Sequence, residues 1–152
     1  MAVTIRTSRD EDVAAILALA SRLTLGVAPW RESSAVVTAV RGWVADAVAS
    51  SNDPTHALFV ARDGERIVGF ISASRTEHWA GDIDAGIGEL VVDGAAEGRG
   101  IGSALVERTL DWSRAQGIGR VSVSTGAANA RALGLYRKLG FEDEDVTLSR
   151  PA

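Results

Sequence analysis

The sequence predicts a mixed α/β fold, with one central sheet of about six or seven strands and about four flanking helices. Apolar residues recur at helical spacing in four stretches and alternate with polar residues in the short stretches between them. No repeat, low-complexity tract or linker divides the 152 residues. We therefore expect a single domain over residues 1–152.

The N-terminal half predicts one strand, two helices and a β-hairpin. Apolar residues of the first helix recur every three or four positions and predict one buried stripe of Val13, Ile16, Leu17, Ala20 and Leu23. In the second helix, Trp43 lies at helical spacing with several valines, so we expect it in the core. The hairpin is indicated by the turn signal Asp63-Gly64. The elements are a strand at 3–6, a helix capped by Ser8 or Asp10, a helix at 32–49 and strands at 57–62 and 67–74.

The C-terminal half predicts three strands and two helices. Val146 and Leu148 alternate with polar residues and indicate the last strand. The other elements are a strand at 86–92, a helix from Ile101 to about Gln116, a strand at 119–125 and a helix at 129–139.

Composition and charge exclude several classes of protein. The sequence has no cysteine, which excludes thiol catalysis, iron–sulfur clusters and disulfide frameworks. With only two histidines, His56 and His78, we expect no histidine-rich site and no metal. The net charge of −4 argues against a nucleic-acid partner and favours cationic or amine-bearing ones.

The N-terminal segment has no signal-peptide pattern, because residues 6–12 are rich in charge. The longest apolar run near it lies between Asp12 and Arg22, well short of the ~20 residues that a membrane span requires. We therefore expect a cytoplasmic protein without a membrane partner.

Residues 89–110 carry the clearest chemical signal. A strand leads into Gly98-Arg99-Gly100-Ile101-Gly102, and a helix follows directly. Glycine permits tight turns and lets a ligand approach the backbone amides. Since the first turn of a helix has unpaired N–H groups and a positive dipole end, we expect a phosphate or pyrophosphate there. A plain strand-to-helix turn is the alternative interpretation.

Two common nucleotide motifs do not match this turn. A Walker A loop requires Gly-Lys-Ser/Thr, and the segment has no lysine. A dinucleotide fingerprint requires glycine where Ser103 stands and an acidic residue about twenty positions later, and residues 118–122 contain none.

Two ordered motifs point to a different phosphate ligand. Residues 97–102 read EGRGIG and approximate Gln/Arg-x-x-Gly-x-Gly/Ala, with Ser-Ala-Leu following at 103–105. Residues 129–141 read NARALGLYRKLGF, in which an Asn and Ala lead to Tyr-x-x-x-Gly-Phe. With the opening TIRTSRDEDVAAILAL, they make the chain resemble the GNAT superfamily of N-acetyltransferases over nearly its whole length.

The resemblance implies acetyl-CoA as co-substrate, with its pantetheine arm between two splayed parallel strands, 86–92 and 119–125. Backbone groups of Leu90, Val91 and Val92 would pair with the arm, and Asn129 would hydrogen-bond the arm or the thioester. Asn129 also fits a helix cap. The amides expected at the pyrophosphate are those of Gly98, Arg99, Gly100, Ile101, Gly102 and Ser103.

One residue departs from the family pattern. Glu97 stands where Gln or Arg is usual. Because a carboxylate beside a pyrophosphate would repel it, we expect Glu97 to point to solvent and the amides to bind the ligand.

Two residues are expected to move protons. Glu89 is the candidate base, on the strand face shared with Ile87 and Val91; an exposed strand position is its alternative, and Asp82 and Asp84 are rivals. By resemblance, Tyr136 would protonate the leaving thiolate, although its helical spacing also fits a core aromatic.

The acceptor side of the site is the least determined by sequence. By resemblance, Trp30, Trp79 and Asp84 would wall a site for the primary amine of a small molecule. A protein N-terminal or lysine acetyltransferase, a non-catalytic acyl-CoA sensor and an interaction module are the alternatives. The resemblance also allows a homodimer.

Overall fold

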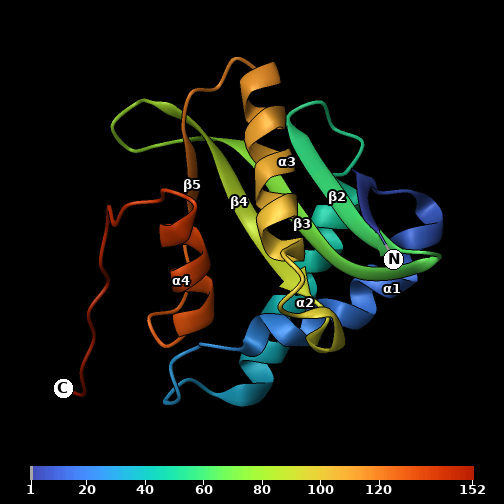
Figure 1. Ribbon diagram of the computed structural model, residues 1–152. Coiled ribbons are helices and arrows are strands. Elements are labelled where there is room, and N and C mark those ends of the chain that lie inside the picture. The colour runs from blue at the N-terminus through green and yellow to red at the C-terminus, as the bar shows by residue number, and fades with distance from the viewer. Residues whose placement is uncertain (1) are drawn as a thin grey trace.

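A five-stranded mixed sheet forms the centre of the computed structural model, which describes residues 2–152 (Figure 1). Its strands lie in the order β1 (Val3–Thr7), β2 (His56–Asp63), β3 (Arg66–Glu77), β4 (Ile83–Val92) and β5 (Val121–Val123). The first four pair antiparallel, and β5 lies parallel to β4. The predicted mixed α/β fold and hairpin are confirmed.

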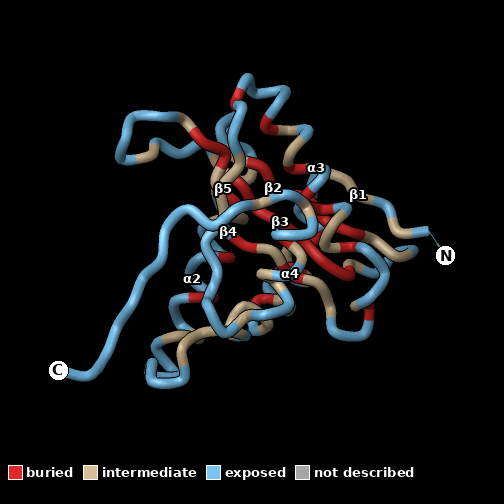
Figure 2. Tube along the Cα trace, turned by 60° about the vertical axis from the view of Figure 1, so that its left-hand side comes forward, coloured by how far each residue is buried: buried red, intermediate tan, exposed pale blue. Residues whose placement is uncertain are grey.

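Helices cover both faces of this sheet, as Figure 1 shows with α3 in front and α2 behind. Helices α1 (Val13–Leu19) and α2 (Ser33–Ala49) pack on one face, where Phe70 and Val91 meet Ile16, Val40 and Val44. Helices α3 (Ile101–Ala115) and α4 (Ala130–Lys138) pack on the other, where Ile71 and Ile87 belong to a cluster with Leu105 and Tyr136. Figure 2 shows the buried residues concentrated along the central strands. From residue 2 onward, none of the helices combines the length and apolar character that a membrane span requires.

The first helical segment is shorter and differently capped than expected. Helix α1 ends at Leu19, and residues 20–24 continue as a 3₁₀ turn. Leu17 is 44% exposed and does not belong to the buried stripe. Its neighbour Ile16 is buried against the sheet, and because each residue of a helix is rotated by about 100° from the one before, Leu17 points away from the sheet. Neither Ser8 nor Asp10 caps the segment. The carboxylate of Asp12 accepts the Arg9 amide at 2.8 Å instead.

Trp43 is not in the core, and the sequence expectation for it is wrong. Its side chain is 53% exposed, whereas Val40 and Val44 are buried. Residues four apart share a helix face, and Trp43 lies about 100° away from Val44. Trp43 therefore stands at the edge of the valine stripe.

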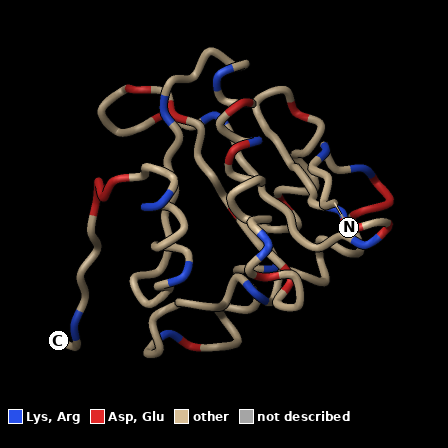
Figure 3. Tube along the Cα trace, viewed as in Figure 1, with Lys and Arg blue, Asp and Glu red and all other residues tan. Residues whose placement is uncertain are grey.

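The expected last strand is absent from the described chain. Residues 142–152 have no helix or strand, and Val146 and Leu148 are 76% and 88% exposed. This segment begins with an acidic run and extends away from the sheet (Figures 1 and 3). Alternation indicates a strand only where an edge is available to pair with it, so the sheet has five strands rather than six or seven.

Candidate active site

Strands β4 and β5 separate part-way along their length. They pair only from Ala85↔Val121 to Ile87↔Val123, after which β4 continues to Val92. Over Leu90–Val92 the other edge of β4 pairs with β3. The edge of β4 facing β5 is therefore open beyond Ile87, which is the splay expected for these strands. An open edge of this kind accepts an extended chain as an added strand.

A β-bulge in β4 sets the direction of Glu89. Ile71 pairs with Leu90 and Ala73 with Ile87, so Gly88 and Glu89 together face Ser72. The extra residue reverses the alternation, and Ile87 packs on the same face as Leu90 while Glu89 lies on the α2 face with Val91. The expectation that Glu89 shares its strand face with Val91 is thus correct, and the expectation that it shares this face with Ile87 is wrong.

Glu89 is buried and held by Ser72. The residue is 8% exposed, which excludes the alternative of an exposed strand position. The Ser72 hydroxyl donates to Oε2 of Glu89, and the Glu89 amide donates to Ser72 Oγ at 2.9 Å. Burial raises the pKa of Glu89, the Ser72 hydrogen bond lowers it, and the negative charge of Asp46 raises it, with a net increase. A carboxylate with a raised pKa is a better proton acceptor near neutral pH.

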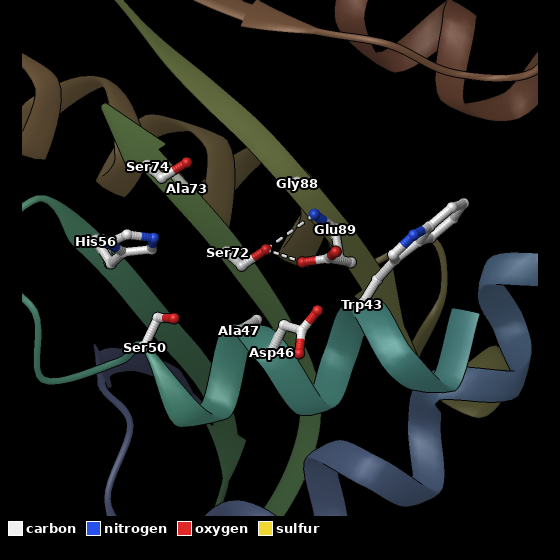
Figure 4. A pocket seen from close by; sticks show the side chains of 11 residues that line it. Trp43, Asp46, Ala47, Ser50, His56, Ser72, Ala73, Ser74, Gly88 and Glu89 are labelled. Carbon is white, nitrogen blue, oxygen red and sulfur yellow. Dashed lines mark hydrogen bonds between the residues drawn. The ribbon is translucent and has the colours of Figure 1, made fainter. Parts of the chain in front are cut away.

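A cavity of about 220 Å³ lies between α2 and the sheet beside Glu89 (Figure 4). In Figure 4, Trp43 and Asp46 from α2 and Glu89 from β4 border the same space. Its charged side chains are Asp46 and Glu89, and its lining contains no lysine or arginine. The polar lining is completed by Ser50, His56, Ser72 and Ser74.

The glycine-rich turn after β4 presents amides at the start of α3. Gly98 and Gly100 have φ angles of +79° and +75°, which favour glycine. The Ala104 amide pairs with the Gly100 carbonyl at 3.0 Å. The amides of Ile101, Gly102 and Ser103 have no acceptor within residues 2–152. Three N–H groups thus stand at the positive end of a 15-residue helix, which suits an anion.

Comparison with known proteins identifies the family. The sequence model of the acetyltransferase (GNAT) family matches residues 15–141. The chain belongs to the GNAT acetyltransferase family.

Curated relatives are similar in sequence to part of this GNAT chain. A mycothiol acetyltransferase of Beutenbergia cavernae is 41% identical over 92 residues, which are 59% of this chain and 29% of that protein. This chain spans less than two thirds of the length of the curated relatives that it matches first.

Two solved structures cover 99% of the chain and their own full length. They are a putative acetyl transferase from Pyrococcus furiosus, with a TM-score of 0.79 and 20% identity, and a transcriptional regulator from Bacillus halodurans C-125, with 0.76 and 26%. The splayed sheet is therefore a GNAT fold.

Glu97 does not point to solvent as expected. Its Oε1 accepts from Arg22 Nη2 at 2.5 Å, and its Oε2 accepts from Arg131 Nη1 at 2.7 Å. Arg22 comes from the turn after α1 and Arg131 from α4. The carboxylate at the unusual position of the GNAT signature is therefore neutralised by two arginines from distant segments.

Asn129 caps a helix and Tyr136 is a core aromatic, which are the structural alternatives that the sequence offered for these two residues. Asn129 Oδ1 accepts the Ala132 amide at 3.1 Å and so caps α4. Tyr136 is 6% exposed and meets Phe141 edge to face at 5.4 Å between ring centroids. Burial raises the pKa of Tyr136 to about 12. Its hydroxyl makes no hydrogen bond with any residue from 2 to 152, so it is available to a ligand.

The predicted acceptor residues do not gather around Glu89. Trp30 and Trp79 are 67% and 87% exposed in loops, and Asp84 is 4% exposed on β4; none of the three lines the cavity. Asp82, a rival base, is exposed in the β3–β4 loop.

A second cluster lies at that loop. His78, Glu144 and Asp145 have potential ligand atoms within 4.8 Å of one another. Both carboxylates are exposed, and the group lies outside the cavity.

Sequence reasoning missed the α2 residues Asp46, Ala47 and Ser50, and for Trp43 it favoured the core over a place in the wall of the acceptor site. Trp43, Asp46, Ala47 and Ser50 are spaced by three and four positions and therefore share a helix face. This face lies beside the valine stripe of α2. The spacing of its residues is the feature of the sequence from which a shared face could have been predicted. That it faces Glu89, however, depends on how α2 packs.

Proposed function

We propose that this chain transfers the acetyl group of acetyl-CoA to a primary amine of a small molecule. The observation that carries the proposal is Glu89, a buried carboxylate with a raised pKa that lines a cavity at the bulge of β4. A proton acceptor is needed there, because an alkylamine with a pKa of ~10.4 is neutral only about once in 10³ molecules at pH 7.

The residues of this chain fit acetyl-CoA. The amides of Ile101, Gly102 and Ser103 have no acceptor within residues 2–152, and together with the preceding amides of residues 98–100 they would hold its diphosphate. The open edge of β4 at Leu90–Val92 would pair with the pantetheine arm, and Asn129 would donate to it through its side-chain N–H groups. Bound there, acetyl-CoA supplies a thioester carbonyl for the amine to attack.

Glu89 and Tyr136 then have complementary roles. As the C–N bond forms and the C–S bond breaks, the Glu89 carboxylate accepts the amine proton. General base assistance of this kind accelerates a reaction by about 10²–10⁴-fold. Tyr136, with a pKa raised to about 12, keeps its proton at neutral pH and donates it to the departing sulfur.

A small-molecule acceptor is supported by the size of the site. A cavity of about 220 Å³ holds a small group rather than a folded surface. The relative from Beutenbergia cavernae is named a mycothiol acetyltransferase, which agrees with a small acceptor.

Cofactor binding is tested by Ser103→Glu. Ser103 is the third residue of α3, where a carboxylate stabilises a helix by about 0.3–1 kcal/mol. The variant should therefore fold as stably as the wild type while its charge repels the diphosphate. Acetyl-CoA at 100 times its Kd should stabilise the wild type by about 2.7 kcal/mol and the variant far less. Ser33→Glu is the matched control, because it adds the same charge to the first turn of α2. Equal stabilisation of Ser103→Glu and wild type would overturn this placement.

Catalysis is tested by thiol release from acetyl-CoA across a panel of small amines. Amine-dependent release, with the acetylated amine identified by mass, supports the proposal. Binding of acetyl-CoA without release from any amine would overturn it in favour of an acyl-CoA sensor. If the chain does not bind acetyl-CoA, the proposal is overturned in favour of an interaction module.

A further inference from the structure

The cavity beside Glu89 contains a second carboxylate that the proposed reaction does not use. Asp46 lies on the face of α2 that lines the cavity, one turn from Trp43 (Figure 4). Its side chain makes no hydrogen bond or ion pair with the part of the chain that the structure describes. The Asp46 carboxylate is therefore free to meet a ligand.

We propose that Asp46 binds a second cationic group of the acceptor, so that the substrate is a small primary amine with two positive charges. This inference rests on the proposed function. Glu89 receives the proton of the amine that reacts. Asp46 pairs with the ammonium that does not react. Asp46 is thus a specificity residue rather than a proton carrier.

The charge of the cavity supports a dication over a monoamine. Its lining holds two carboxylates and no lysine or arginine, and Glu89 is 8% exposed. Glu89 is buried and Asp46 is exposed where it borders the same cavity, and the Asp46 charge raises the pKa of Glu89. A single ammonium would leave one carboxylate without a counter-charge.

Glu89 itself points to a ligand. Ser72 holds only its Oε2, and Oε1 has no hydrogen-bond partner within residues 2–152. Oε1 is accessible on a side chain that lines an open cavity, so it is suited to a charged donor from outside the chain.

The remaining lining suits a short polar cation. The indole of Trp43 lines the cavity, and an aromatic face attracts ammonium groups. Ser50, Ser72 and Ser74 offer further acceptors. The volume of about 220 Å³ leaves room for a short diamine.

The test compares three acceptors of similar length: 1,4-diaminobutane, 4-aminobutan-1-ol and butylamine. For the wild type, kcat/KM should be highest for the diamine, by about tenfold or more over the others. Asp46→Asn should lower the diamine value by about tenfold, mainly through KM, and leave the two monoamines within about twofold. Asp46→Glu should retain part of the preference, since it keeps the charge.

Asp111→Asn is the matched control, because it removes one exposed carboxylate from α3, outside the cavity. It should leave all three acceptors unchanged. Equal activity toward diamine and monoamines in the wild type, or an equal loss for all three in Asp46→Asn, would overturn the inference while leaving acetyl transfer intact.

Calorimetric binding of 1,4-diaminobutane without coenzyme separates the two proposals. Binding by the wild type that is lost in Asp46→Asn supports the second-cation site, even if no amine releases thiol and acetyl transfer is thereby refuted. Binding that is unchanged in Asp46→Asn would overturn the inference.

Discussion

Replacing Glu97 with glutamine tests the role of the neutralised carboxylate at the glycine-rich turn before α3. Glu97→Gln keeps the shape of the side chain and removes the charge that faces Arg22 and Arg131. Glu97 is 28% exposed, and its partners are 32% and 65% exposed, so both ion pairs are partly solvated. Pairs of this kind contribute about 0.2–1 kcal/mol each, which predicts a loss of about 0.4–2 kcal/mol.

This loss can be measured as a thermal shift. A change of 1 kcal/mol shifts Tm by about 2–4 °C in a chain of this size, so the variant should melt about 1–8 °C below the wild type. Salt at 1 M should narrow the difference, because both ion pairs are partly exposed to solvent and salt screens exposed charges. The control Asp111→Asn breaks a single pair whose members are 66% and 69% exposed, and it should shift Tm less.

Coenzyme binding should respond in the opposite direction. Without the Glu97 charge, Arg22 and Arg131 carry positive charge beside the start of α3 with no carboxylate between them. The negatively charged coenzyme should then bind more tightly and raise the Tm of the variant by more than that of the wild type. An unchanged melting temperature together with weaker binding would refute this reasoning.

Three further substitutions address the proton-transfer groups and the N-terminal ion pair. Glu89→Gln should reduce turnover several-fold or more at neutral pH, and the acidic limb of the kcat/KM profile should disappear; a profile identical to that of the wild type would remove Glu89 from its role. The pKa of Glu89 is raised in the folded state, so protonated Glu89 favours folding below about pH 4.5. This contribution is lost as the pH rises through the raised pKa. At pH 8, Glu89→Gln should therefore be more stable than the wild type in denaturant titrations. Tyr136→Phe should fold normally and lose turnover modestly, since a thiolate with a pKa near ~8.5 leaves readily; wild-type turnover would contradict its role as an acid. Asp12→Asn should lower the unfolding free energy by about 3 kcal/mol, because Asp12 is 4% exposed and binds Arg6 through both oxygens at 2.6 and 3.0 Å. Since the Arg6 hydrogen bond lowers the pKa of Asp12, the wild-type advantage should be complete above about pH 3.8 and be lost as the pH falls from there through the lower pKa of the folded state.

The sequence by itself predicted most elements of the fold and the location of the glycine-rich turn before α3. Helical spacing, strand alternation and the glycine signals are local properties, and they placed β2, β3, β4 and α3 nearly where the structure has them. Glu89 was also identified from its place on the strand beside the turn. The sequence did not predict that residues 142–152 lack a strand, since pairing requires an available neighbour.

Only the tertiary structure decided which side chains meet. The bulge at Gly88-Glu89 depends on the register against β3, and it turned Glu89 away from Ile87 and toward α2. Asp46 is 43 positions earlier in the chain, and Arg22 and Arg131 reach Glu97 from opposite ends of it. Periodicity specifies the face of each element that is apolar. It does not specify which distant element covers that face, because this is set by packing and strand register across the whole domain.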